Sequence, residues 1–515
     1  MVSSILVDAL AHPSQAIQDL ADDGGDLNEL PIRVSKYFSD VFASPDAFNE
    51  ITVLDPNTPL ESLKPRTLVR FDGMVQDTAC SPEIYLSRRD DGRVGGWGSY
   101  EHDDAGDDTK PVDYNLLREC NVVWAVSIPG QSSWCRGGSE VASTDSKPLL
   151  PHKYPHPSSP HLGLQVKVYD STFSESLRTT DLHSFVGVLT SDPWHTASDA
   201  GSSTLVPTIH LLFARKIAPT LVPRAFPDSS FESPVQEVRE QLVAWIADEA
   251  LAGDKLAAEW VLISLVSKVQ SRTPPILPLS LTLSGYGASK GQRPRLIEVL
   301  SHLVPMVSVL PITLDTVNTT AFVPESKDED LHSGWLQQPK GSLCVLSEVA
   351  LDEGTVSEKG VYNLRMVQET MATQTLDYVF PFSQFSFEAD INFIVLASGR
   401  KSAFFQTQLQ IPVQGAAEAG LYIADNRPVR LPSPQALSEY RKLIGGAKIA
   451  NVTLDERTAN FIQDDFVKAR QAGASRKNAG NTDNTVTPDD LIVRMMAARL
   501  LAASYPQTRS DGRGL

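Results

Sequence analysis

Two apolar runs in the second half of the chain constrain its fold most strongly. Residues 343–346 read Leu-Cys-Val-Leu and are followed by Ser347 and Glu348, and residues 391–397 form a second run. In a P-loop ATPase, a strand of this kind ends in Asp-Glu, where the Asp holds magnesium and the Glu orients the attacking water. Ser347 stands in the Asp position, and a neutral hydroxyl is a poor ligand for a hard divalent cation. We therefore expect an ATPase-like layer that lacks the ATPase chemistry.

Helices alternate with apolar strands around these runs. Two amphipathic helices are predicted within residues 234–272, a strand at 279–284, a helix at 295–303 and a strand at 307–313. Such alternation favours an α/β layer with mainly parallel strands. We therefore assign residues 233–425 to a degenerate AAA+-like α/β domain.

A glycine-rich segment, residues 285–291, stands where a phosphate-binding loop is expected. A working loop has the order G-x-x-x-x-G-K-[ST], so that backbone amides, the lysine and the hydroxyl reach the phosphates and magnesium. Here Lys290 precedes Gly291, and Gln292 stands where the hydroxyl is needed. ATP hydrolysis is therefore not expected and no cofactor-binding residue is assigned, although residual phosphate binding by Lys290 stays open.

The same segment contains the pattern G-x-S-x-G at residues 287–291, which occurs at the nucleophile elbow of some hydrolases. An elbow joins a strand directly to a helix, but Gly285 and Tyr286 intervene here. Downstream, His302 and His332 lie in no acid-then-histidine order that is typical of a triad. We therefore expect a surface loop and assign no catalytic residue to it.

The remaining polar residues also yield no catalytic or metal site. Glu348 could serve as a base, but further acids follow it, which favours a solvated acidic turn; these acids are Asp352, Glu353 and Glu358. Three histidines among prolines lack the cysteines or regular spacing of a metal site; they are His152, His156 and His161. The cysteines form no C-x-x-C pair, so neither zinc nor disulfides are expected; they are Cys80, Cys120, Cys135 and Cys344.

Short strands dominate the first half of the chain. They are predicted at residues 68–77, 83–86, 122–128, 165–169, 184–189 and 208–214, with a bend at Gly73 where the alternation breaks. Short strands separated by polar loops favour a closed β-barrel of the oligonucleotide/oligosaccharide-binding (OB) kind. We assign residues 59–225 to this OB-like barrel. Two insertions within it, residues 90–108 and 139–161, have the composition of disordered linkers.

An OB-like barrel raises the alternative of a single-stranded nucleic-acid-binding protein. Such proteins place aromatic stacking platforms beside a basic groove. The candidate aromatic residues have few basic neighbours, and the formal net charge of −18 would repel phosphates. We therefore expect these aromatic side chains to pack in the core or against a partner. The aromatic residues are Phe71, Tyr85, Trp124 and Trp134, and the basic residues are Arg70, Arg88, Arg89 and Arg118.

Helices are predicted at both ends of the chain. The N-terminal helical segment, residues 1–58, has its clearest helix at 32–42, whose apolar face must dock on another surface. The C-terminal helical region, residues 434–515, carries helices at 455–470 and 488–504. No basic n-region of a signal peptide and no apolar run of 18 residues is found, so an intracellular protein without membrane association is expected.

Several motifs resemble, in order and spacing, the mini-chromosome maintenance (MCM) complex-binding protein family. The most specific are SEVALDEG at residues 347–354, GVYN at 360–363, LDY at 376–378 and IVLASGRKS at 394–402. The segments VKVYD at 166–170 and FVGVL at 185–189 carry the same resemblance, which extends over residues 32–504. The terminal helix loosely resembles the helical lid of the MCM subunits themselves.

This resemblance implies a nuclear, non-enzymatic partner of the MCM replicative helicase. It implies a role in DNA replication, in dissociation of the helicase from chromatin late in S phase, in protection of nascent subunits and in sister-chromatid cohesion. Contact with chromatin would then be indirect, since the acidic charge argues against direct DNA binding. The fold expected is an α+β, multi-domain chain in which an OB-like barrel precedes a degenerate AAA+-like domain and C-terminal helices.

Overall fold

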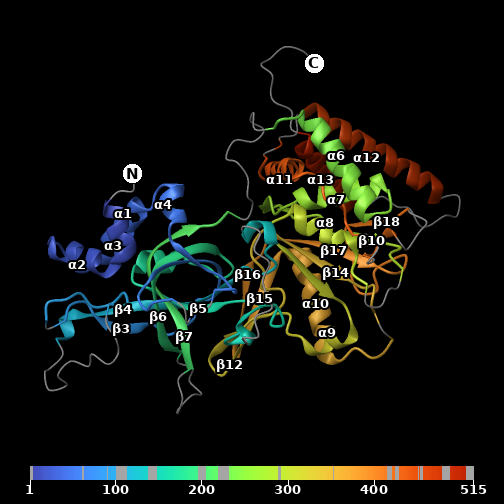
Figure 1. The fold of residues 1–515 in the computed structure, drawn as a ribbon. Helices are drawn as coiled ribbons and strands as arrows, with labels where there is room; N and C mark the ends of the chain where they lie inside the picture. Colours follow the sequence, from blue (N-terminus) through green and yellow to red (C-terminus); the bar gives the residue numbers. More distant parts are fainter. Residues whose placement is uncertain are drawn as a thin grey trace.

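The structure is a computed structural model of the chain. It describes residues 4–58, 60, 63–89, 91–99, 113–136, 148–194, 204–218, 231–287, 292–351, 353–414, 420–423, 428–450, 452, 456–477 and 488–505. Helices and separate sheets form a mixed α/β, multi-domain protein, as the sequence predicts. We call residues 4–218 the N-terminal lobe and residues 231–505 the C-terminal lobe; the two lie side by side (Figure 1). Within the described residues, no helix is both long and apolar enough to cross a membrane.

Five strands of the N-terminal lobe close into a ring. They are β2 (Leu68–Asp77), β4 (Leu117–Ser127), β5 (Gly163–Val168), β6 (Leu182–Trp194) and β7 (Thr204–Lys216). The order is β2-β6-β7-β5-β4, a further β4–β2 pairing closes the ring, and only the β5–β7 pair in it is parallel. Gly73 lies opposite both His183 of β6 and Ser127 of β4. A Cβ atom there would lie 2.9 Å from the carbonyl oxygen of Val126, which accounts for the glycine at the predicted bend.

Four short helices cover one side of this ring (Figure 1). They are α1 (Ser4–Ala11), α2 (Pro13–Asp22), α3 (Leu30–Val41) and α4 (Pro45–Asn49). Phe38 and Phe42 pack with Val186 and Phe213 of the ring, and the rings of Phe42 and Phe213 stack with centroids 6.1 Å apart. The apolar face predicted for residues 32–42 therefore docks on the adjacent strands. The lobe is completed by β1 (Thr52–Leu54), β3 (Glu83–Leu86) and α5 (Ser171–Ser176).

Two segments that were expected to be disordered are packed where the structure describes them. Trp97, in residues 91–99, is buried against the ring, and Lys153 and Tyr154, in residues 148–161, are buried between the lobes. The expectation of disorder is therefore wrong for these two stretches, because a few large side chains bury enough surface to order a polar segment. The remaining parts of both insertions lie outside the described residues.

A five-stranded parallel sheet forms the centre of the C-terminal lobe. Its order is β11-β14-β17-β10-β18, and each neighbouring pair is parallel. The strands are β10 (Leu281–Ser284), β11 (Val307–Pro311), β14 (Ser342–Ser347), β17 (Ile391–Ala397) and β18 (Leu409–Pro412). Both apolar runs of the sequence are thus neighbouring central strands, buried along their whole length. Burial on both faces explains why these strands show no alternation of polar residues.

Helices cover both faces of this sheet. One face holds Val345 and Leu396 and lies under α6 (Val235–Ala250), α7 (Lys255–Val266), α8 (Arg295–Leu303), α11 (Pro434–Ile449) and α13 (Pro488–Ser504). The other face holds Leu346 and Val395 and lies under α9 (Leu314–Thr319) and α10 (Glu358–Thr373). Neighbouring residues of one strand therefore enter two different cores, as the pleat of a strand requires.

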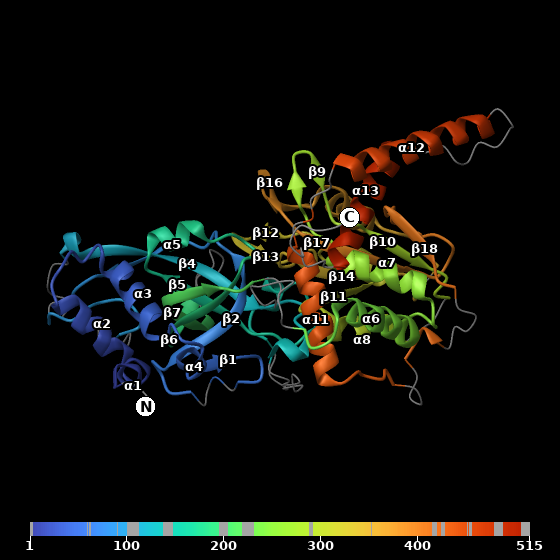
Figure 2. The ribbon, with the colours of Figure 1, turned by 90° about the horizontal axis from the view of Figure 1, so that it is seen from above.

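A second, four-stranded sheet lies between the parallel sheet and the N-terminal lobe (Figure 1). Its order is β13-β12-β15-β16, with β12 (Glu325–Lys327), β13 (Asp330–His332), β15 (Thr375–Phe380) and β16 (Ser383–Glu388). A small hairpin pairs β8 (Ser271–Arg272) with β9 (Pro275–Ile276). Helix α12 (Glu456–Lys477) extends away from the body of the lobe (Figure 2).

Candidate functional site

The candidate phosphate loop begins at the carboxyl end of β10, but its first backbone amides are already paired. The N–H groups of Gly285 and Tyr286 donate to carbonyl oxygens at and just beyond the end of β17, both at 3.1 Å. The Tyr422 hydroxyl donates to the carbonyl oxygens of Tyr286 and Gly287, at 2.8 and 2.9 Å. Amides that are paired within the protein are not available to cradle a phosphate. Lys290 lies outside the described residues, so phosphate binding by its side chain stays a prediction.

Glu348, directly after β14, is buried and not solvated. Its Oε1 atom accepts a hydrogen bond from the Ser402 hydroxyl at 2.7 Å, and its Oε2 atom accepts one from the backbone N–H of Ala403 at 3.0 Å. The prediction of a solvated acidic turn is therefore wrong for Glu348, although Glu353 and Glu358 are exposed as expected; Asp352 lies outside the described residues. A carboxylate whose two oxygens hold a loop of the protein is poorly placed to accept a proton from water.

The two candidate histidines of a hydrolase triad, His302 and His332, lie on different elements. His332 belongs to β13, and its ring centroid lies 4.2 Å from that of His152 at the contact between the lobes. His302 lies in the last turn of α8, where its carbonyl oxygen accepts a hydrogen bond from Arg441 at 2.7 Å. The described residues of the G-x-S-x-G segment end at Gly287, so the position of its serine is not described. The two histidines are not paired in one acid–base arrangement.

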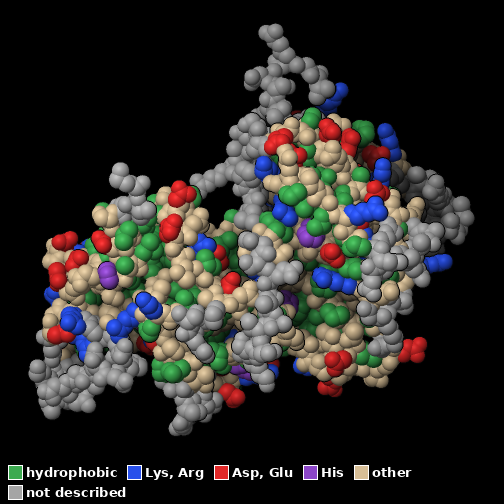
Figure 3. Space-filling view, in the orientation of Figure 1, with side chains coloured by type: hydrophobic (Ala, Val, Ile, Leu, Met, Phe, Trp, Pro, Cys, Tyr) green, Lys and Arg blue, Asp and Glu red, His purple; other side chains and the backbone are tan. Residues whose placement is uncertain are grey.

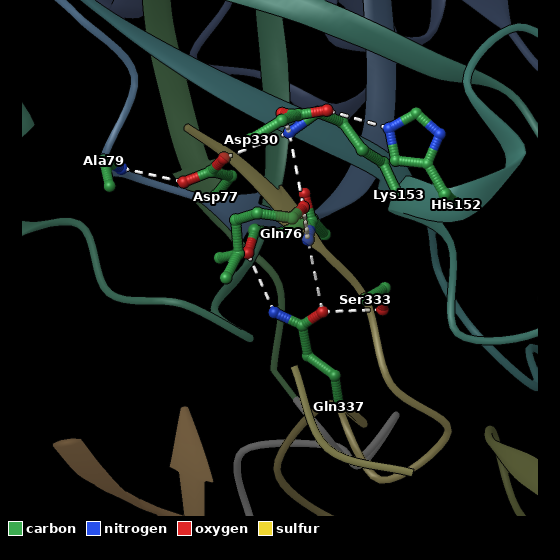
Figure 4. A network of polar contacts seen from close by, with 9 residues as sticks. Gln76, Asp77, Ala79, His152, Lys153, Asp330, Ser333 and Gln337 are labelled. Atoms are coloured by element: carbon green, nitrogen blue, oxygen red, sulfur yellow. Dashed lines mark hydrogen bonds and ion pairs between the residues drawn. The ribbon is translucent and has the colours of Figure 1, made fainter. Parts of the chain in front are cut away.

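A polar cluster that the sequence did not predict lies at the contact between the lobes (Figure 4). The side chain of Lys153, which follows β4 in the chain, is 0% exposed. Its Nζ atom lies 3.1 Å from Oδ2 of Asp77 in β2 and 2.5 Å from Oδ1 of Asp330 in β13. The Nε2 atom of His152 lies 2.8 Å from the other oxygen of Asp330. One buried cation of the N-terminal lobe thus pairs with an acid from each lobe.

Gln337 extends this cluster into the C-terminal lobe (Figure 4). Its side-chain nitrogen donates to the carbonyl oxygen of Gln76 at 2.8 Å and to the Tyr378 hydroxyl at 3.1 Å, and its oxygen accepts from the Ser333 hydroxyl at 2.7 Å. The side-chain nitrogen of Gln76 donates to the carbonyl oxygen of Leu331 at 3.2 Å. Buried polar groups with fixed partners favour one arrangement over its alternatives. The cluster therefore holds the lobes in one relative position.

The ion pair of Lys153 with Asp330 favours the charged form of both groups. Burial lowers the pKa of Lys153, but the carboxylates of Asp77 and Asp330 raise it by more, so that the pKa of Lys153 is raised overall. Burial raises the pKa of Asp330, but the hydrogen bond with His152 and the charge of Lys153 lower it by more. Nearby, burial lowers the pKa of His156 to about 4, which a hydrogen bond with Gln338 opposes only in part. His156 is therefore neutral at physiological pH.

The aromatic residues that could have stacked bases are used for packing. Phe71 and Trp124 are fully buried, and Tyr85 packs edge-on against Tyr169 with ring centroids 5.0 Å apart. The indole N–H of Trp134 donates to a carbonyl oxygen of α8 at 2.9 Å. On the face shown in Figure 3, Lys and Arg side chains are scattered among acidic ones. Phe71 and Trp124 thus pack in the core, as predicted, whereas Tyr85 and Trp134 are partly buried and pack against their neighbours; none of the four forms an exposed stacking platform.

The hairpin of β15 and β16 instead presents aromatic side chains to solvent. Phe382 at its turn is 101% exposed, and Phe385 and Phe387 of β16 are 54% and 37% exposed. β16 is exposed along its length and forms the edge of the described sheet. Edge strands are often protected by charged side chains, proline or a bulge; β16 has no lysine, proline or bulge, and its one charged residue, Glu388, is its last and pairs with Arg272 of β8 at 3.3 Å. Apolar groups clustered on an open edge are typical of a surface that binds another protein.

Comparison with known proteins identifies relatives that span nearly the whole chain. The family described as mini-chromosome maintenance replisome factor matches residues 38–151 and 139–511. A protein of Gallus gallus is 23% identical over 615 residues, covering 98% of this chain and 94% of the relative. A protein of Arabidopsis thaliana is 24% identical (92% and 89% covered), and one of Salmo salar is 26% identical (92% and 90% covered). Each of these three is named mini-chromosome maintenance complex-binding protein.

Proposed function

The chain belongs to the family of mini-chromosome maintenance (MCM) complex-binding proteins, and from this premise we propose that it is a non-enzymatic partner of the MCM replicative helicase. In this role it acts in the nucleus, promotes removal of the helicase from chromatin late in S phase and protects nascent subunits. DNA replication, cell division and sister-chromatid cohesion then depend on it through the helicase, and its contact with chromatin is indirect.

We further propose that the two lobes are an OB-like barrel and a degenerate AAA+-like domain. The closed ring supports the first assignment. Its third and fifth strands, β5 and β7, are the parallel pair, and helix α5 joins β5 to the fourth strand, β6, as in an OB fold. The all-parallel sheet supports the second, because β10 leads into a glycine-rich loop and β14 ends at the same edge in Ser347 and Glu348. The positions of the phosphate-binding loop and of the Asp-Glu pair of a P-loop ATPase are then both present, but the side chains that bind phosphate and magnesium are missing.

The non-enzymatic role is supported most directly by the hydrogen bonds at this edge of the parallel sheet. The amides of Gly285 and Tyr286 are paired with the end of β17, and both oxygens of Glu348 are held by the loop at Ser402. Groups that would bind phosphate or activate water in an ATPase are thus used to fix the backbone. A chain built in this way can present an MCM-like surface to MCM subunits, and so compete with the contacts that subunits make with one another.

We propose that the hairpin of β15 and β16 belongs to the surface that contacts an MCM subunit. Support comes from the exposure of Phe382, Phe385 and Phe387 and from the open edge of β16. An extended segment of the partner can add to this edge through main-chain hydrogen bonds, with the aromatic rings providing apolar contacts.

The test is size-exclusion chromatography of the purified chain with MCM subunits, with and without ATP and magnesium. We expect co-elution that does not depend on nucleotide, and equal co-elution for Glu348→Gln. Failure to form any complex, together with oligonucleotide binding that falls steeply with salt, would favour the single-stranded nucleic-acid-binding alternative.

A further inference from the structure

Three metal-binding side chains meet where the two lobes touch. His152 comes from the segment between β4 and β5, and Asp330 and His332 come from the two ends of β13. One ligand atom of each lies within 4.8 Å of the ligand atoms of the other two. We propose that these three residues bind a divalent transition-metal ion, with Zn²⁺ as the best fit, and that the ion joins the lobes.

The donor set suits this ion. Two imidazole nitrogens and one carboxylate oxygen are typical ligands of Zn²⁺, with a water molecule in the fourth position. Metal–ligand distances of about 2 Å place tetrahedral donors roughly 3.3 Å apart, so ligand atoms that lie within 4.8 Å of one another need to move by at most about 1.5 Å. His152 Nε2 and Asp330 Oδ2 are 2.8 Å apart; they would separate by about 0.5 Å as the ion takes the place of the proton between them.

Neighbouring groups hold these ligands in position. Lys153 occupies Oδ1 of Asp330, which turns Oδ2 toward His152. The backbone N–H of Ser333, next to His332, donates to the carbonyl oxygen of His152 at 2.8 Å and so ties the two ligand-bearing segments together. Partners of this kind, one step removed from the metal, fix the orientation of its ligands.

The charge around the three ligands and the opening of the site to solvent also suit a cation. Lys153 carries one positive charge, whereas Asp77 and Asp330 carry two negative charges, and the exposed acids Asp328 and Glu329 lie in the turn before β13. A cleft of about 390 Å³ is lined by Asp77, Glu329 and Asp330 and opens beside the site. The side chain of His152 is 33% exposed, which leaves room for a water ligand.

The ion would act on the relative position of the lobes. His152 belongs to the N-terminal lobe, and the other two ligands belong to the C-terminal lobe, so bound metal adds a link across the contact. His152 and Asp330 are 178 residues apart in the chain, so the ligands form no local sequence motif. This inference is independent of the binding of MCM subunits.

The experiment uses the full chain without an affinity tag. Isothermal titration with ZnCl₂ is expected to show one ion per chain, and Co²⁺ is expected to give the visible absorption of a site with nitrogen ligands. Zn²⁺ should also raise the melting temperature, since a ligand selective for the folded state stabilises it. Absence of one-to-one binding at micromolar Zn²⁺ would overturn the proposal.

Variants separate this site from other metal-binding groups. His332→Ala and His332→Gln should each weaken Zn²⁺ binding at least tenfold and abolish the stabilisation by Zn²⁺. His12→Ala, which removes an exposed histidine before α2, is the matched control and should bind like the parent chain. Circular dichroism shows that each variant is folded. Binding that is unchanged in a folded His332 variant would show only adventitious metal binding and would reject the site.

Discussion

The Nζ atom of Lys153 lies 2.5 Å from the Asp330 carboxylate, in an ion pair that crosses from one lobe to the other. The lysine side chain is fully buried and also pairs with Asp77 of its own lobe at 3.1 Å. Removing one member of a buried ion pair leaves the other uncompensated, which costs far more than losing an exposed pair. Lys153 therefore contributes to the contact between the lobes through a buried charge, beside the hydrogen bonds of Gln76 and Gln337.

Lys153→Met is expected to lower the free energy of unfolding by about 3 kcal/mol, because Asp77 and Asp330 are left buried without a cation. Chemical denaturation followed by tryptophan fluorescence measures this change. The matched control is Lys468→Met on the exposed side of α12, for which a change within about 0.5 kcal/mol is expected. A loss below about 1 kcal/mol for Lys153→Met would contradict the role of this ion pair.

Glu348→Ala is expected to lower stability by about 1 to 3 kcal/mol, because the Ser402 hydroxyl and the Ala403 amide lose their acceptor. Hydrogen exchange should show faster opening of the loop after β17. Glu353→Ala removes an exposed acid of the same turn and serves as the control. If the two variants were equally stable, the hydrogen bonds of Glu348 would not stabilise the loop.

Stability should fall as the pH is lowered from 6.5 toward 4. The pKa of His156 is about 4 in the folded chain, whereas the ordinary pKa of a histidine is 6.5, so the unfolded chain binds the proton first in this window. Stability from this group is complete above pH 6.5 and decreases by up to roughly 3 kcal/mol toward pH 4. His156→Gln should flatten the stability profile over this range, whereas His12→Gln should leave it unchanged. Parallel profiles for parent and His156→Gln would refute this assignment.

The double variant Phe382→Ser and Phe385→Ser is expected to keep the stability of the parent chain, because both rings are mostly exposed. Capture of MCM subunits in a pull-down should weaken about tenfold or more, as for aromatic residues at the centre of an interface. Tyr114→Ser removes another exposed aromatic side chain, on the N-terminal lobe, and should not affect capture. Equal capture by both variants would place the contact on another surface.

The sequence predicted the parts of the fold that depend on local pattern. The apolar runs at 343–346 and 391–397 became buried parallel strands, and the break at Gly73 marks where β2 changes neighbours. The resemblance to the family, based on motifs at 347–402, is confirmed by matches over most of the chain. The edge strand β16 was not predicted, because its alternation of Phe with polar residues is short and its aromatic face is exposed.

The residues of the candidate site could not be predicted in the same way, because their partners are distant in the chain. Glu348 resembles other acids of its turn until Ser402, 54 positions later, is placed beside it. His152 and Lys153 lie among prolines and serines, a composition typical of disorder, and the partners that order the segment, such as Asp77 and Asp330, are distant in the chain. Long-range ion pairs leave no periodicity in the sequence from which they could be inferred.

Neither lobe can melt without uncovering a charge that the other neutralises. Loss of the N-terminal lobe would leave Asp330 without Lys153, and loss of the C-terminal lobe would leave Lys153 with only one of its two acids. The two lobes are therefore expected to unfold in one cooperative transition, although chains of this length commonly melt domain by domain. A protein that binds only the hairpin of β15 and β16 would then raise the melting temperature of the distant ring of strands as well.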